Sequence, residues 1–144
     1  ELAKPFPRES IEWRVQRTTK DGTAGLALAY VNARTVQDRL NEVMGSNWQC
    51  KHINYGPKTI CHLGLKFNGD WIWRSDGAGD TNFEADKGAI SDSLKRAAVH
   101  FGVGRHLYDL PSVFVKVQKD QRGQIKINQD DCWEAVRRKQ SDFS

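Results

Sequence analysis

The stretch SDSLKRAAVHFGVG, residues 91–104, decides the fold because its small and apolar residues predict a long helix that two glycines close. We expect this helix to cover residues 83–101, with Thr81 and Glu84 forming a capping box at its start. At about 100° per residue, one face of the helix collects its apolar side chains, and we expect that face to pack on a sheet. The face comprises Phe83, Ile90, Leu94, Ala97, Ala98 and Phe101.

The polar side of this helix carries a Lys-Arg pair. Lys95 lies at the border of the apolar face, Lys87 lies close to that face, and Arg96 points elsewhere. Because an ammonium group is costly to bury without a partner, a lysine at this border reaches solvent or meets an anion such as a phosphate. An alternative is an ion pair between Asp92 and Arg96, four residues apart, beside a solvent-directed lysine. The residues alone leave both open.

A hairpin and a shorter helix precede the long helix. Residues 11–17 alternate apolar and polar side chains, and the Lys-Asp-Gly turn at 20–22 connects them to a second strand over residues 23–31. Asn32 can cap a helix over residues 33–44, which a glycine closes.

The remaining strands are expected to form a three-stranded meander and a C-terminal hairpin. The Asn68-Gly69 pair is the strongest two-residue hairpin signal in the chain. We therefore predict an α+β fold, in which a curved antiparallel sheet packs on one long helix and a C-terminal hairpin and short helix follow. These strands cover residues 48–54, 59–67, 70–75, 113–117 and 124–128, and the last helix covers residues 130–139.

Two tryptophans share one face of the hairpin around Asn68-Gly69. A two-residue loop places Lys66 opposite Trp71 and Gly64 opposite Trp73. This face suits base stacking or a subunit contact, and we favour the contact; coverage by the C-terminal segment is the alternative. One face then carries His62, Lys66, Trp71 and Trp73, and the core face carries Leu63, Leu65, Phe67 and Ile72.

Composition limits the classes of partner. The 144 residues fit one domain, and 22 Lys and Arg against 18 Asp and Glu give a net charge of +4, which favours a polyanionic partner. No apolar run approaches the ~18 residues of a membrane span, so we expect no membrane partner. Cys50, Cys61 and Cys132 cannot all pair with one another and form no Cys-x-x-Cys motif, which favours a reduced, intracellular setting.

Two kinds of metal chemistry can be weighed. Cys50, His52, Cys61 and His62 suggest zinc, but the strand register sends the His62 side chain to the face opposite the other three, and a closed zinc site needs four converging ligands. We therefore predict no metal site.

A nuclease is the other metal-dependent possibility. Magnesium could be bound by four acidic residues, but two of these lie in a glycine-rich turn and one caps the helix. The GAGDTN segment that starts at Gly77 lacks the glycine pattern of a nucleotide loop, so we predict no nucleotide cofactor and no enzyme activity. The four acidic residues are Asp76, Asp80, Glu84 and Asp86.

Three stretches resemble the Rad52/Rad22 single-strand annealing family. They are WRVQR at 13–17, YVNARTVQDRLNEVMG at 30–45, followed by the Trp48 strand, and GAISDSLKRAAVHFGVGRHLYDLP at 88–111. The chain looks closest to the bacterial and phage branch of the family. This resemblance implies a single-strand annealing core domain over residues 1–111, and we expect residues 112–144 to pack on the same domain as an extension.

The same resemblance implies a function. Family members bind single-stranded DNA in a basic groove and anneal complementary strands without ATP, as homo-oligomeric rings or arcs, in recombination and double-strand break repair. The resemblance also implies that the protein acts in a bacterium or a phage-infected cell, in the cytoplasm or nucleoid. A recombinase or a single-strand binding protein is a further candidate partner. A metal-dependent nuclease and a monomeric protein that protects DNA ends remain alternatives.

Site residues follow from the resemblance position by position. Lys95 and Arg96 match the helix pair that contacts the phosphate backbone, Arg17 matches an arginine of the first hairpin, and Lys58 matches a lysine of a second, outer DNA site. We add Arg14 from the strand that carries Arg17.

The chain also departs from the family pattern. Eukaryotic relatives carry an arginine where this chain has Val99, and a longer basic loop where it has residues 79–83. We expect Lys87 or Arg105 to substitute for these missing cations.

Overall fold

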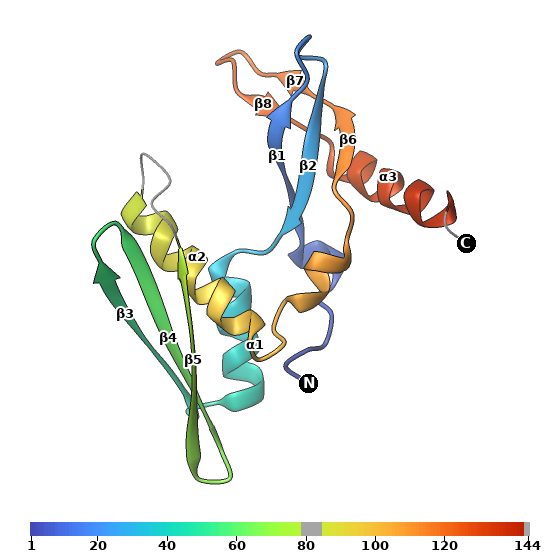
Figure 1. The fold of residues 1–144 in the computed structure, drawn as a ribbon. Coiled ribbons are helices and arrows are strands. Elements are labelled where there is room, and N and C mark those ends of the chain that lie inside the picture. The colour runs from blue at the N-terminus through green and yellow to red at the C-terminus, as the bar shows by residue number, and fades with distance from the viewer. Residues whose placement is uncertain (79–84, 143–144) are drawn as a thin grey trace. The chain divides into compact units, whose positions relative to one another are not determined.

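The computed structural model describes residues 1–78 and 85–142, with the side chains of residues 85–87 and 141–142 outside that description. Antiparallel sheets and helices make the fold α+β, as predicted (Figure 1). The chain divides into two compact units that do not follow sequence order, because the first hairpin groups with the C-terminal segment. Unit 1 comprises Glu1–Phe6 and Val31–Arg105, and unit 2 comprises Pro7–Tyr30 and His106–Ser144.

Unit 1 is built on a meander. Its sheet has the order β3 (Trp48–Tyr55), β4 (Lys58–Phe67) and β5 (Asp70–Ala78). The turn between β4 and β5 is Asn68-Gly69, whose φ angles of 52° and 87° lie in the left-handed region that Asn and Gly accept most readily. This local turn sets the predicted pairing of Lys66 with Trp71, Leu65 with Ile72 and Gly64 with Trp73, which is confirmed.

Helix α1 (Ala33–Met44) has the predicted bounds because both of its ends are fixed locally. The Asn32 side chain accepts a hydrogen bond from the backbone N–H of Thr35 at 2.9 Å, and Gly45 at a φ of 58° ends the helix. Val36 and Leu40 are buried on the side of α1 that faces the core of unit 1.

Helix α2 (Ala85–Val99) packs on β4, β5 and α1. The prediction that Ile90 belongs to its buried face is wrong, because the Ile90 side chain is 47% exposed. Ser93 is buried instead, since its hydroxyl donates to the Ile90 carbonyl at 2.9 Å and so needs no water. The predicted capping residues Thr81 and Glu84, and Phe83 of the predicted buried face, lie outside the described residues. The buried face comprises Ala89, Ser93, Leu94, Ala97 and Ala98.

Unit 2 packs a three-stranded sheet on a helix. The sheet has the order β1 (Glu12–Thr18), β2 (Ala24–Tyr30) and β6 (Val113–Lys116), and α3 (Gln129–Asp142) packs on β6 and β1. Within the core, the Trp13 and Trp133 rings meet edge to face, with centroids 5.4 Å apart. The buried core residues are Trp13, Ala27, Val113, Val115, Cys132 and Val136.

The C-terminal strands pair differently from the prediction of one hairpin over residues 113–117 and 124–128. β6 pairs with β2 instead, and Val113 and Val115 bury one face of β6 against α3. Only the two-residue strands β7 (Gln118–Lys119) and β8 (Ile125–Lys126) form a hairpin, because the Asp120 carboxylate accepts the N–H groups of Arg122 and Gln124 and tightens the turn. Two 3₁₀ helices, η1 (Arg8–Ser10) and η2 (Arg105–Asp109), complete the described elements. None of the described helices has the length and apolar character that crossing a membrane requires.

Candidate nucleic-acid interface

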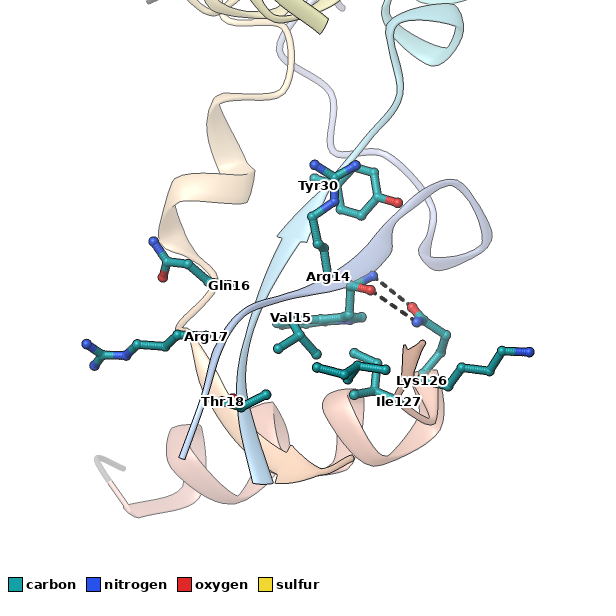
Figure 2. Close-up of a pocket in the computed structure, with 11 residues that line it drawn as sticks. Arg14, Val15, Gln16, Arg17, Thr18, Tyr30, Lys126 and Ile127 are labelled. Carbon is teal, nitrogen blue, oxygen red and sulfur yellow. Dashed lines mark hydrogen bonds between the residues drawn. The ribbon is translucent and has the colours of Figure 1, made fainter. Parts of the chain in front are cut away.

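A bulge in β1 decides where the first-hairpin arginines lie. Val15 pairs with Ala27 on the core face, and strict alternation along β1 would send Arg17 to that face as well. The register instead pairs Arg17 with Leu26 and leaves Gln16 as an extra residue. Figure 2 shows Gln16 and Arg17, neighbours in sequence, projecting to the same side.

The bulge therefore places two arginines on the outer face of β1. Arg14 pairs with Leu28, and Leu28 shares a face of β2 with Leu26, the partner of Arg17. The Arg14 guanidinium lies over the Tyr30 ring, with its carbon 4.7 Å from the ring centroid. Among the described residues, no carboxylate forms an ion pair with either arginine.

Tyr30 is held in place beneath Arg14. Its hydroxyl donates a 2.6 Å hydrogen bond to the Glu12 carboxylate, and this bond is the main cause that raises the pKa of Tyr30. Tyr30 therefore stays neutral, and its ring lies against the Arg14 guanidinium.

A cleft of about 630 Å³ runs along β1 (Figure 2). The Gln129 side chain is part of its lining, accepting from the Trp13 N–H at 2.8 Å and donating to the Trp13 carbonyl at 3.2 Å, as a paired strand would. Arg17 and Lys126 project away from each other in Figure 2, so the cleft presents cations on separate sides. Its lining includes Arg14, Arg17, Thr18, Tyr30, Lys126 and Ile127.

The predicted helix pair lies on α2 in unit 1. Lys95 is partly buried, and its Nζ lies 3.5 Å from an Asp92 carboxylate oxygen. Asp92 therefore pairs with Lys95, three residues later, and the alternative prediction of an ion pair between Asp92 and Arg96 is wrong. Arg96 is exposed, and within the described part of the chain no ion pair involves it. Arg105 is also exposed and donates to the carbonyl of Val99, the last residue of α2, at 2.9 Å. The Lys87 side chain lies outside the described residues.

Lys58 occupies a different surface from Lys95 and Arg96. The odd-numbered residues of β4 from Thr59 to Leu65 are buried on the face where α2 packs. Lys58 belongs to the even-numbered set, whose side chains project from the opposite face. The outer-site residue therefore does not join the α2 pair.

Trp71 and Trp73 share the face of Lys58 and Lys66. Their rings are nearly parallel, with planes at 29° and centroids 6.2 Å apart, and each side chain is 38% exposed. The Trp73 ring shields Gly64. Lys51 of β3 also reaches this face, with its Nζ 5.6 Å from the Trp73 ring centroid.

Several of these side chains were not found from the sequence. Lys51 could have been, because the pairing of β3 with β4 places it opposite His62 and so on the tryptophan face. Tyr30 could have been found from its pairing with Glu12. Lys126 and Gln129 carry no local pattern that connects them with β1.

The residues considered for zinc separate as the register predicted. His52 pairs with Cys61 on the face toward α2, and His62 on the opposite face contacts the Ser75 hydroxyl at 2.6 Å through Nδ1. The Cys61 thiol is a hydrogen-bond partner of Cys50 and lowers the Cys50 pKa. No cluster of three metal-binding side chains occurs within residues 1–78 and 88–140, for which side chains are described.

The acidic residues considered for a nuclease are only partly described. Asp76 accepts from the Gly77 N–H at 2.7 Å, and its other oxygen lies 2.9 Å from His100 Nε2. Asp80, Glu84 and the side chain of Asp86 lie outside the described residues.

The sequence of this chain is similar to that of one protein family and of two named proteins. The Rad52/22 family, whose members are described as double-strand break repair proteins, matches residues 1–62 and 58–126. The single-stranded DNA-binding protein DdrA of Deinococcus radiodurans is 34% identical over 124 residues, which cover 85% of this chain and 60% of that protein. DdrA of Deinococcus deserti is 38% identical over 117 residues, covering 79% and 58%. No solved structure matches the chain.

The chain spans about three fifths of the length of these relatives. The family match includes the three stretches that carried the resemblance in the sequence, so the predicted kinship is confirmed. It also extends beyond residue 111, to residue 126, where the sequence alone suggested no relative. The chain therefore belongs to the Rad52/22 family of double-strand break repair proteins.

Proposed function

We propose that this chain binds single-stranded DNA and anneals complementary strands without ATP, as a ring- or arc-forming homo-oligomer, in recombination and double-strand break repair. It would act without making or breaking covalent bonds and would therefore not be an enzyme. Both DdrA relatives are named single-stranded DNA-binding proteins, which supports the choice of ligand.

One observation carries the proposal: Arg14 and Arg17 lie on one face of β1, beside a cleft and an aromatic ring, and no carboxylate among the described residues pairs with them. Guanidinium groups donate two parallel hydrogen bonds to a phosphate, so two arginines along one strand suit a backbone of regularly spaced phosphates. Tyr30 offers an aromatic surface at the same place.

Helix α2 supports the same ligand. Arg96 projects into solvent from a helix whose other side is packed against the sheet, so its position is fixed while its charge stays accessible. Lys95 is partly buried beside Asp92, and a phosphate near it would compete with that carboxylate for the ammonium group.

Annealing follows from contacts of this kind. Phosphate contacts hold a strand without reading its sequence, and they leave the base edges free to pair with a second strand. Because such binding is largely electrostatic, two bound strands can change register without losing specific contacts.

An annealing assay tests this proposal. Complementary oligonucleotides with donor and acceptor fluorophores are mixed with the protein without ATP, and we expect pairing to accelerate. Arg17→Ala and Arg96→Ala should each slow the acceleration. Arg138→Ala should not, because Arg138 lies on α3, on the side of the unit 2 sheet opposite Arg17, and is a matched exposed cation.

Other outcomes would identify the alternatives. Tight single-strand binding without accelerated pairing would indicate a protein that protects DNA ends. Magnesium-dependent strand cleavage would indicate a nuclease. Either result would contradict annealing as the function.

Self-association is tested separately by light scattering. Exposed apolar side chains such as Ile90 and Phe114 are available for subunit contacts. We expect a mass many times the 16.4 kDa of one chain. A strictly monomeric particle at micromolar concentration that still anneals DNA would refute ring assembly as the working state.

A further inference from the structure

The outer face of the β3–β4–β5 sheet, the face away from α2, has an unusual composition. Its residues are every second residue of β3 from 49 to 55, of β4 from 58 to 66 and of β5 from 71 to 77. None of these residues is acidic, whereas Lys51, Lys58 and Lys66 are basic. Both helices of unit 1 lie on the other side of this sheet (Figure 1). The outer face is therefore positive and carries aromatic side chains.

The Trp73 ring lies flat on this face. A Cβ atom built on Gly64 would stand 2.9 Å from three atoms of the six-membered ring of Trp73, so the Cα–Cβ direction of Gly64 meets the ring face. Because that direction is perpendicular to the sheet, the ring plane runs parallel to the sheet. One ring face covers Gly64 and the other is turned outward.

Trp71 extends the flat surface. Its ring is tilted by 29° from that of Trp73, and the centroid separation of 6.2 Å is close to the two-residue repeat of a strand, about 6.8 Å. The two rings therefore lie side by side along β5. Each side chain keeps 38% of its surface exposed.

Lysines lie at both rings, and the Lys51 ammonium lies over the Trp73 ring. The Nζ atom of Lys51 lies 5.6 Å from the Trp73 ring centroid, and Lys66 pairs with Trp71 across the β4–β5 ladder. Two outward aromatic faces with ammonium groups beside them match planar bases joined by phosphates.

We propose that Trp71 and Trp73 form a stacking platform for unstacked bases of single-stranded DNA, with Lys51 and Lys66 contacting the flanking phosphates. This platform is distinct from the α2 residues Lys95 and Arg96, which lie on the other side of the sheet. It rests on the proposed function, because the DNA strand is its ligand.

The structure favours base stacking on this face over the subunit contact that the sequence pattern predicts. A second copy of a chain with a net charge of +4 complements a face without carboxylates less well than a polyanion does. The outward ring faces also fit planar groups.

Two probes separate stacking from phosphate contacts. A fluorescein-labelled oligothymidine and an abasic strand of the same length carry the same phosphates, but only the first carries bases. We expect the protein to bind oligothymidine more tightly. Trp71→Ala and Trp73→Ala should each weaken oligothymidine binding by at least about fivefold per base released and leave abasic binding unchanged.

Gly64→Ala is a second variant that leaves both tryptophans in place. Its added methyl group would displace the Trp73 ring, so it should weaken oligothymidine binding without changing the salt dependence, because no phosphate contact is lost. Trp71→Phe should restore most of the affinity lost in Trp71→Ala. Tyr108→Ala, an exposed aromatic residue in unit 2, serves as the control and should bind as the original chain does.

Three other results would contradict either the stacking platform or the proposed function. If the original chain binds both probes equally and Trp71→Ala binds as tightly as it does, the platform is refuted while the proposed function stands. If Trp71→Ala instead lowers the particle mass in light scattering and keeps its affinity per subunit, the face is a subunit contact. If the original chain binds neither probe, the proposed function fails and the platform fails with it.

Discussion

Arg39 should be the most costly single polar side chain to remove from unit 1. It is only 8% exposed, and one of its terminal nitrogens donates to the carbonyls of Leu2 at 3.0 Å and Lys4 at 2.6 Å. Its guanidinium also lies over the Phe6 ring, 4.2 Å from the centroid. Arg39 of α1 thus holds the segment Glu1–Phe6 against the rest of unit 1.

The magnitude follows from these contacts. Hydrogen bonds to charged groups are worth about 1.5–3 kcal/mol each, and the cation–π contact adds about 0.5–2 kcal/mol. Arg39→Met does not lose the whole of this hydrogen-bond and cation–π energy. Methionine keeps most of the packing of the side chain, and release of residues 1–6 lets water bind the freed carbonyls. The Phe6 side chain, buried to 7% exposure, contributes about 1.5–3 kcal/mol that disappears with that release. We therefore expect Arg39→Met to lower the free energy of unfolding by about 2–4 kcal/mol.

Urea unfolding monitored by tryptophan fluorescence measures this loss. Arg39→Lys should lose about half as much, because an ammonium group can still donate to both carbonyls but has no planar surface for Phe6. Phe6→Ala should be less damaging in the Arg39→Met background than alone, since both act through the same segment. A loss below about 0.5 kcal/mol for Arg39→Met, typical of a surface substitution, would refute this reasoning.

Three further outcomes follow from local contacts. Asn32→Ala should lower the free energy of unfolding by about 1 kcal/mol through loss of the α1 cap, and Asn32→Asp should retain it; urea midpoints show both. Gln129→Leu should cost about 2 kcal/mol by the same measure, because the Trp13 backbone N–H and carbonyl both lose their partner, and an unchanged midpoint would contradict this. Cys50 should be alkylated by iodoacetamide faster than an ordinary thiol at pH 7.5, since hydrogen bonding from the Cys61 thiol lowers its pKa and raises the thiolate fraction, and Cys61→Ala should slow the reaction.

The parts of the fold that the sequence predicted correctly have local causes. The bounds of α1 follow from Asn32 and Gly45, and the register of β4 with β5 follows from Asn68-Gly69. The wrong parts depend on distant partners. An ideal helix places Ile90 on the buried face, but the buried face of α2 is set by its contacts with both α1 and the sheet. Helix periodicity alone does not predict those contacts. The pairing of β6 with β2 joins segments about 90 residues apart, which turn patterns cannot predict.

The candidate site divides in the same way. Helix periodicity places Lys95 at the border of the apolar face, whereas Arg96, Arg17 and Lys58 follow only from the family resemblance. The outer position of Arg17 depends on the bulge at Gln16, which has no local signature such as glycine. The lining of the cleft includes Gln129, which contacts β1 across 116 residues of sequence.

The central claim is that Arg17 and Arg96 contact phosphates of single-stranded DNA, and the salt dependence of binding tests it most directly. The dissociation constant of a labelled oligothymidine is measured between about 50 and 200 mM salt for the original chain, Arg17→Ala, Arg96→Ala, the double variant and the control Arg138→Ala. Each single variant should flatten the slope of log K against log salt by about 0.7, the double variant by about 1.4, and the control not at all. Slopes for both single variants equal to that of the original chain, with normal urea midpoints, would contradict the claim.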